Sequence, residues 1–255
     1  MPKIITEDMI EQAAIKALQE WHDYTVLNCM TEEPDTLPDG TRRKDKKQVV
    51  LPKVMFESLC RINPDIPKQT VRTVVDELCH TPVSGDLMLT NYQNYQKIRN
   101  GITVEYNKNG KKTSNILRLL SYNDVLSNTF TVASQMWIKG ETHWRRPDLI
   151  IFINGFPMIF IELKNSNIPV KNAYDINLKN YLKDIPYLFN YNQICVLSNG
   201  METRLGSFAA GYEFFFEWLK VENEKENPDR KAIRENCTSL EYFIAGLCEP
   251  KNLLD

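Results

Sequence analysis

Two short apolar segments separated by a turn sequence constrain the fold of this chain more than any other feature. Residues 149–153 and 158–163 are rich in β-branched and aromatic side chains, and Asn-Gly-Phe-Pro lies between them. Such segments favour strands, and Asn-Gly is a favoured hairpin turn. The pattern therefore predicts two buried antiparallel strands.

Charged residues stand at one end of this predicted hairpin. Asp148 begins the first strand, while Glu162 and Lys164 close the second. Charged side chains are rare in buried strands unless they are paired or bind a ligand. Glu162 and Lys164 are two residues apart and therefore share one face of the strand. The hairpin thus indicates a functional site at this end.

The strand register decides whether Asp148 joins that site. A three-residue loop at 154–156 would place Asp148 opposite Glu162 on the same face, whereas a two-residue loop at Asn154-Gly155 would place them on opposite faces. Turn preference slightly favours the two-residue loop. A shared site therefore requires a three-residue loop or a β-bulge.

Two neighbouring carboxylates repel each other unless a cation lies between them. Oxygen ligands with no His or Cys nearby favour magnesium over zinc. We expect Asp148, Glu162 and the backbone carbonyl of Leu163 to hold the ion. Lys164 would orient or deprotonate the attacking water and offset negative charge on the phosphoryl group.

The site residues resemble a known nuclease motif. Pro147-Asp148, followed after thirteen residues by Glu162-Leu163-Lys164, is similar to PD-(D/E)xK. The flanking Arg-Arg-Pro-Asp, Asn-Gly-Phe-Pro and Ile-Glu-Leu-Lys-Asn resemble the N-terminal endonuclease region of the restriction (motor) subunit of type I restriction-modification enzymes. The resemblance covers nearly the whole chain, with further similar segments at residues 6–14, 185–186, 189–192 and 198–207.

The resemblance implies an α/β (α+β) fold with a mixed sheet and a PD-(D/E)xK restriction-endonuclease-like core. It also implies Mg²⁺-dependent hydrolysis of double-stranded DNA in the cytoplasm, during restriction of foreign DNA. The implied partners are methyltransferase and specificity subunits, with no membrane, and ATP would act only through a motor domain.

Three further site residues follow from the resemblance. An acid on the first helix can reach the metal in related nucleases, so Glu11 is a candidate ligand, although we favour a solvated helix glutamate. Related nucleases often carry Gln-x-x-x-Tyr on the helix after the motif. Here Asn177 precedes Tyr181, so the tyrosine is present and the glutamine is not. Asn177 and Tyr181 are therefore candidate DNA contacts.

The overall charge argues against strong unaided DNA binding. The net charge is −2 and the pI is about 6.0, so a nuclease would need local basic patches or a partner. We read two patches as a solvated charged loop and a turn, and give Arg145 and Arg146 even weight as DNA contacts because they precede Asp148. The basic patches are Arg42, Arg43, Lys44, Lys46 and Lys47; Lys108, Lys111 and Lys112; and Lys139, Arg145 and Arg146.

Composition excludes several other classes. The sequence has no run of eighteen apolar residues and no signal-peptide core, so neither membrane insertion nor export is indicated. Six cysteines without a CxxC pair indicate reduced thiols in a cytosolic protein, and three histidines without ligand spacing argue against structural zinc.

Periodicity predicts the remaining elements. Thr6 caps a first helix, and a mobile loop spans 31–48. A mostly antiparallel sheet of about five strands would contain the hairpin and three preceding strands, with a later strand parallel to the 158–163 strand. The predicted helices are 52–62, 69–78, 86–99, 172–184 and 238–248, and the additional strands are 102–106, 115–120, 130–138 and 193–198.

These elements suggest two parts. Residues 1–211 would form the nuclease domain, with a helical insertion at 52–100. Residues 212–255 would form a C-terminal extension of an aromatic segment, a charged linker and a helix leading towards an ATP-dependent translocase. No GxxxxGK(S/T) loop occurs in the sequence, so the motor itself is not in these residues.

Two alternatives stay open at this point. The chain could be a catalytically weak, nuclease-like module that anchors the motor to the methyltransferase and specificity subunits. The aromatic cluster at 214–218 and the excess of acidic residues would suit that role. Alternatively, Glu162 and Lys164 form only a surface salt bridge, worth about 0–1 kcal/mol.

Overall fold

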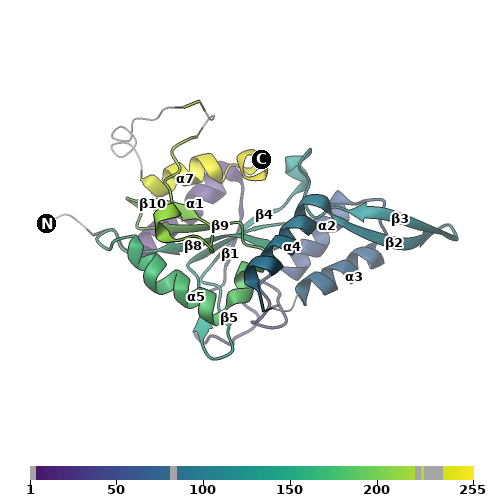
Figure 1. Cartoon of the computed structure of the whole chain (residues 1–255), viewed down its shortest axis with the longest axis horizontal. Helices are drawn as coiled ribbons and strands as arrows, with labels where there is room; N and C mark the ends of the chain where they lie inside the picture. The colour runs from purple at the N-terminus through teal and green to yellow at the C-terminus, as the bar shows by residue number, and fades with distance from the viewer. Residues whose placement is uncertain (1–3, 81–84, 222–224, 227–237) are drawn as a thin grey trace.

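A six-stranded mixed sheet forms the centre of the protein (Figure 1). The computed structural model describes residues 4–80, 85–221, 225–226 and 238–255. The strand order is β1-β4-β7-β8-β9-β10. These strands are β1 (Thr25–Asn28), β4 (Phe130–Ser134), β7 (Leu149–Ile153), β8 (Phe156–Leu163), β9 (Ile194–Ser198) and β10 (Thr203–Gly206). The sheet contains both parallel and antiparallel strands, and helices are interspersed with them along the chain, so the fold is of the predicted mixed α/β class.

The β7–β8 hairpin has both the short turn and a bulge. Asn154 and Gly155 have φ values of 51° and 85°, and Ile153 pairs with Phe156, so the loop has two residues. The register then shifts next to Phe152, and Leu149 pairs with Ile161. Continuing that register brings Asp148 opposite Glu162. The bulge, one of the two conditions set by the sequence, therefore restores the shared face.

Gly155 is required by both its backbone conformation and its surroundings. An added Cβ would lie 2.7 Å from the Leu51 carbonyl oxygen and 2.9 Å from the Met55 nitrogen. We expect Gly155→Ala to lower the free energy of unfolding by about 1–3 kcal/mol from strain alone, and more from the clash. Urea unfolding would measure this loss.

Gly110 provides the matched control, because its φ is 77° but nothing lies within 4 Å of an added Cβ. Gly110→Ala should therefore show only the strain contribution. Equal losses for the two variants would contradict the packing argument.

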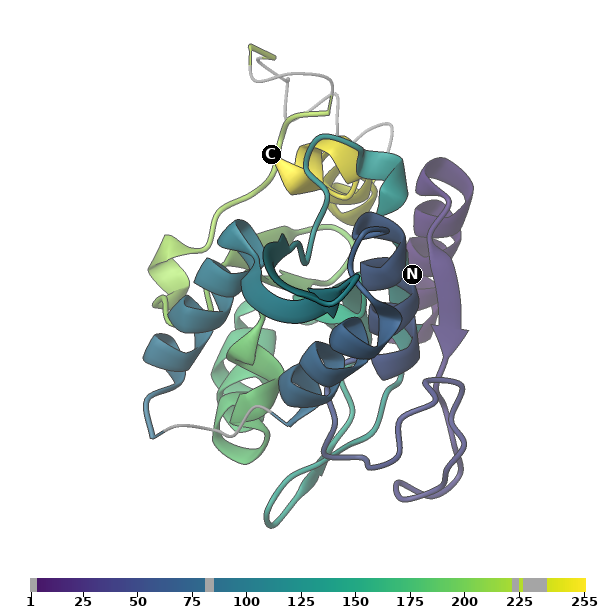
Figure 2. The ribbon, with the colours of Figure 1, turned by 90° about the vertical axis from the view of Figure 1, so that its right-hand side faces the viewer.

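The strands predicted at 102–106 and 115–120 do not join the main sheet. They form a separate two-stranded ribbon of β2 (Ile102–Lys108) and β3 (Lys111–Leu117), which projects from the body (Figures 1 and 2). The reason is packing: the ribbon buries Val104 and Tyr106, and β2 contacts α3 (Lys68–Cys79). The prediction of their place was wrong, and the short strands β1 and β10 occupy the sheet edges instead.

The predicted strand 130–138 is also interrupted. β4 ends at Ser134, and Gln135 adopts the left-handed conformation with a φ of 54°. After this break, β5 (Ile138–Lys139) pairs with β6 (Trp144–Arg145) in a small sheet of its own. The chain thus leaves the main sheet immediately beside Asp148.

The crossover between β8 and β9 follows the prediction. β9 runs parallel to β8, as a helical connection requires. The helix expected at 172–184 begins with a π-helical turn at Ala173–Leu178 and continues as α5 (Lys179–Asp184). A 3-10 segment, Pro186–Asn190, then leads to β9.

Helices flank the sheet. α1 (Glu7–His22) and α7 (Ser239–Leu247) pack together on one face, and α5 lies on the other (Figure 1). Thr6 caps α1 as predicted, accepting a hydrogen bond from the Met9 nitrogen at 3.3 Å. The other helical elements are α2 (Pro52–Ile62), α3 (Lys68–Cys79), α4 (Leu87–Asn100), α8 (Pro250–Leu254) and the 3-10 turns Val125–Ser127 and Tyr212–Phe214.

Helix α7 is attached to the rest of the protein through the end of α1 and Tyr24. The Tyr24 hydroxyl donates to the Cys248 carbonyl at 3.0 Å, and His22 Nε2 lies 2.9 Å from the Ile244 carbonyl oxygen. The charged linker before this helix falls mostly outside the described residues. The domain boundary at residue 211 and the motor beyond it stay predictions.

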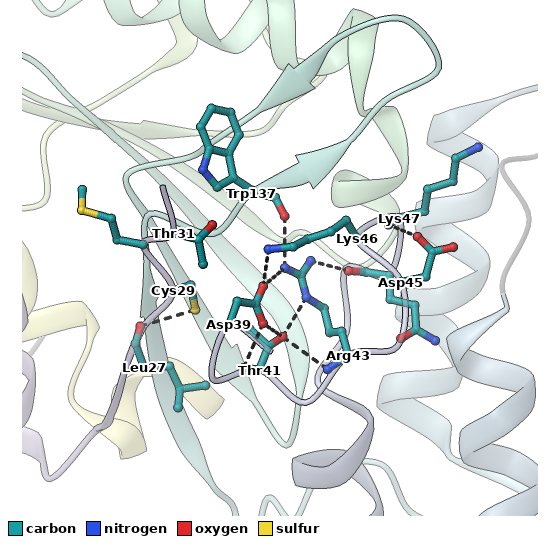
Figure 3. A network of polar contacts seen from close by, with 12 residues as sticks. Leu27, Cys29, Thr31, Asp39, Thr41, Arg43, Asp45, Lys46, Lys47 and Trp137 are labelled. Carbon is teal, nitrogen blue, oxygen red and sulfur yellow. Dashed lines mark hydrogen bonds and ion pairs between the residues drawn. The ribbon is translucent and has the colours of Figure 1, made fainter. Parts of the chain in front are cut away.

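The loop at 31–48 contains a buried charged cluster (Figure 3). Asp39 accepts hydrogen bonds from Arg43 at 2.7 Å and from Lys46 at 2.8 Å. Arg43 and Lys46 are only 4% and 3% exposed. Reading these two residues as part of a solvated loop was therefore wrong, because the carboxylate pairs with both cations inside the protein. The mobility of the loop stays a prediction.

The helices and the cysteines of the described residues bear on the classes of protein considered from composition. Within those ranges, every helix is too short or too polar to span a bilayer. Five of the six cysteines lie there, and none of these five forms a disulfide.

Candidate functional site

The C-terminal end of β8 and the start of β7 bring Asp148, Glu162 and Lys164 together. Asp148 Oδ2 accepts a hydrogen bond from the Leu163 nitrogen at 2.7 Å, which ties the aspartate to the motif strand. Lys164 Nζ donates to Glu162 Oε1 at 2.9 Å and to the Leu163 carbonyl at 2.6 Å. The strand register thus produces a compact group of two carboxylates and one ammonium.

Glu162 is the most buried of the three, at 2% exposure. Burial, followed by the negative charge of Asp148, raises the pKa of Glu162 to about 8 against the opposing effects of Lys164 and Tyr181. Glu162 Oε2 is buried and has no hydrogen-bond partner among the described residues. A buried carboxylate oxygen without a partner is costly, so this atom is suited to meet a cation.

Asp148 is in a related environment. Burial raises its pKa, while the Leu163 N–H and the Lys164 charge oppose that effect. One ammonium therefore faces two carboxylates that are both disfavoured as anions by their surroundings. Added positive charge would stabilise the ionised pair.

Glu11 is buried beside this group. It is 6% exposed, and its carboxylate accepts a hydrogen bond from Gln135 Nε2, which also donates to Asp148 Oδ1 at 3.3 Å. Burial raises the pKa of Glu11 to about 7. The preferred reading of Glu11 as a solvated glutamate was therefore wrong, because α1 turns this position towards the site.

Gln135 is the residue that sequence reasoning missed. Its backbone nitrogen donates to the Asp148 carbonyl at 2.9 Å, and its side chain bridges two carboxylates. A non-glycine residue with positive φ is uncommon and is enriched at functional sites. No feature of the sequence predicts this left-handed conformation, because Gln135 lies within an otherwise regular strand pattern.

The oxygen atoms gathered at this site are of the kind that binds magnesium. Asp148, Glu162 and the Leu163 carbonyl supply only oxygen atoms, and Glu162 Oε2 is available. Within the described ranges, no group of three or more His, Cys, Asp and Glu side chains converges as a metal centre. Asp148, Glu162 and the Leu163 carbonyl are the groups that could hold an ion, and the role of Glu11 as a ligand stays a prediction. Because the Lys164 ammonium contacts two of these groups, a bound ion would share that face with it.

The predicted DNA contacts fall into different environments. Arg145 Nε donates to Asp184 Oδ2 at 2.7 Å, so its charge is already paired. The Arg146 guanidinium lies 4.9 Å from the centre of the Trp137 ring and lowers the pKa of Glu11, which places its charge near the carboxylates. Of the two, Arg146 is better placed to act at the site.

Tyr181 is buried next to Glu162, whose pKa it helps to lower. It is 6% exposed, its ring lies 5.2 Å from that of Phe160, and its hydroxyl donates to the Arg146 carbonyl at 3.1 Å. It can therefore position Arg146 rather than present a surface to DNA. Asn177, on the π-helical turn, is half-buried, and its contact with DNA stays a prediction.

The family model that matches this chain is the type I restriction enzyme R protein N terminus, over residues 4–235. This match covers most of the chain, and the six-stranded sheet and the carboxylate pair lie within it. The chain therefore belongs to the family of type I restriction enzyme R-subunit N-terminal regions. The resemblance drawn from the motif and its flanks is confirmed.

Individual relatives agree with the family. The HindI endonuclease subunit of Haemophilus influenzae is 33% identical over 84% of this chain and 20% of its own length. The putative MjaIXP endonuclease subunit of Methanocaldococcus jannaschii is 28% identical over 99% of this chain and 25% of its own length. The chain thus spans a fifth to a quarter of these relatives.

Proposed function

We propose that this chain is a Mg²⁺-dependent DNA endonuclease module with a PD-(D/E)xK core. The observation that carries the proposal is the meeting of Asp148, Glu162 and Lys164, with a buried Glu162 oxygen that has no partner among the described residues. A buried ionic group is weak support for a fold by itself, because desolvation offsets much of its attraction. Two carboxylates and an ammonium in so apolar a place are better explained by catalysis.

Each residue has a role in this proposal. Asp148, Glu162 and the Leu163 carbonyl would hold Mg²⁺, which when bound supplies Lewis-acid stabilisation and lowers the pKa of a water molecule. Lys164 orients the attacking water and offsets negative charge on the phosphate. Gln135 holds the Asp148 carboxylate in place through its amide. The leaving oxygen departs opposite to the attacking water.

Assembly with other subunits is the second candidate. The HindI relative is named as an endonuclease subunit of a type I enzyme, and we infer that this chain works with methyltransferase and specificity subunits. Phe214 and Phe216 are 70% and 53% exposed, which offers apolar surface for such contacts. Anchoring and catalysis are compatible roles for one module.

Magnesium titration tests the site directly. We expect the chain to bind Mg²⁺ in the millimolar range or tighter by isothermal titration calorimetry, and Glu162→Gln to lose that binding because a neutral amide replaces the carboxylate. Glu20→Gln is the matched control, since Glu20 is exposed on α1 at 58%. Unchanged binding in Glu162→Gln would remove the metal assignment.

A further inference from the structure

The projecting β2–β3 ribbon concentrates positive charge in an otherwise acidic protein. The 22 residues from Lys97 to Arg118 contain six Lys and Arg residues and one Glu, a net charge of +5. Because the whole chain has a net charge of −2, the remaining residues carry −7. Such an asymmetry indicates an anionic partner for this segment.

The ribbon tip places like charges directly opposite each other. Lys108 and Lys111 are cross-strand partners beside the Asn109-Gly110 turn, and both are exposed. Like charges in that arrangement destabilise a hairpin. Lys112 is 2.7 Å from Glu105, the only acid of the segment. The two remaining lysines therefore have no acid within the ribbon to balance them.

The ribbon base contains a basic hollow. A cavity of about 360 Å³ is lined by Arg99 and Arg118, together with Asn100, Tyr122 and Asn123. In the part of the chain that the structure describes, neither arginine forms an ion pair. Arginine, amide and tyrosine side chains are the groups that contact phosphate and sugar in protein–DNA complexes. The hollow thus extends the positive surface from the tip to the body.

We propose that the β2–β3 ribbon is an arm that binds the phosphate backbone of double-stranded DNA. A two-stranded ribbon is narrow enough to enter the major groove, and its lysines would then face phosphates. This inference rests on the proposed function, because it supplies the DNA affinity that the overall acidic charge does not. It also replaces the earlier reading of these lysines as an ordinary turn.

Fluorescence anisotropy with a short labelled duplex tests the arm. Replacing Lys108, Lys111 and Lys112 together by Gln should weaken binding at least about tenfold, and the dependence of log K on log salt should fall by about 0.9 for each lost phosphate contact. The control replaces Lys16, Lys53 and Lys171 by Gln, an equal charge change at side chains that are 71%, 45% and 61% exposed. It should bind nearly as the parent chain does.

The outcomes separate the arm from the active site. Equal weakening of the two triple variants would overturn the proposal, because total charge alone would then explain binding. Unchanged DNA binding with lost association to a partner subunit would also overturn it, in favour of protein docking. Glu162→Gln should keep arm-dependent DNA binding and its salt dependence, so failure of the nuclease proposal would leave this measurement intact.

Discussion

Glu162→Gln is expected to reduce DNA cleavage by at least about 100-fold in a type I restriction enzyme that carries this chain. Within the described residues the buried Glu162 Oε2 has no hydrogen-bond partner, and a neutral amide in place of this carboxylate cannot offset a divalent charge. Metal-assisted stabilisation contributes several kcal/mol to such reactions, and each 1.4 kcal/mol is tenfold in rate. A plasmid-nicking assay with Mg²⁺ would measure the loss.

Further variants assign the loss to the site. Asp148→Asn should be similarly inactive, and Lys164→Ala should be strongly impaired because its ammonium lies 2.9 Å from Glu162. Asp175→Asn is the control, since Asp175 is exposed on the π-helical turn and pairs with Lys179. ATP hydrolysis by the same preparations should be unchanged. Cleavage at the parent rate by Asp148→Asn and Lys164→Ala would refute the catalytic assignment.

Local patterns predicted the centre of the fold well. The β7–β8 hairpin follows from strand composition and an Asn-Gly turn, and the crossover helix and β9 follow from a change in periodicity. These signals depend on neighbouring residues only. The helices predicted at 52–62, 69–78 and 86–99 accordingly begin and end within one residue of α2, α3 and α4.

Features set by distant contacts escaped prediction. The ribbon strands were identified, but the sheet to which they belong depends on packing against α3. Gln135 contacts Glu11 across 124 positions of sequence, and its positive φ leaves no local trace. A β-bulge and a three-residue loop were both open as ways to bring Asp148 opposite Glu162. Turn preference predicts the length of the loop but not the bulge near Met158. The burial of Arg43 also depends on enclosure by the loop rather than on local charge.

The second large effect is expected at the charged cluster in the 31–48 loop. Asp39→Ala should lower the free energy of unfolding by about 3–5 kcal/mol, because it leaves Arg43 and Lys46 buried without their carboxylate. Asp45→Ala is the control, since Asp45 lies on the same loop but is exposed. Urea unfolding at neutral pH would compare them, and equal small losses would contradict the account.

The same cluster predicts how stability depends on pH. Burial alone would raise the pKa of Asp39, but hydrogen bonds from Lys46 and Thr41 and the charge of Arg43 outweigh it and hold the pKa well below its usual range. A depressed folded-state pKa stabilises the protein above the unfolded-state value of about 3.9, and this contribution is lost as pH falls towards the folded-state value. Asp39→Ala should therefore lack that part of the acid dependence below about pH 4.

A compensating variant distinguishes unpaired charge from lost packing. In Asp39→Ala/Lys46→Met, one buried cation is removed, while Arg43 keeps its hydrogen bonds to the carbonyls of Gln48 at 2.7 Å and Trp137 at 3.0 Å. We expect this double variant to recover stability relative to Asp39→Ala, since a buried cation without a partner costs more than an apolar side chain. In the recovered variant Arg43 should still bind the Trp137 carbonyl and so hold Trp137 in place. The ring of Trp137 lies against Arg146 beside the carboxylates. A double variant less stable than Asp39→Ala would show that Lys46 contributes through packing instead.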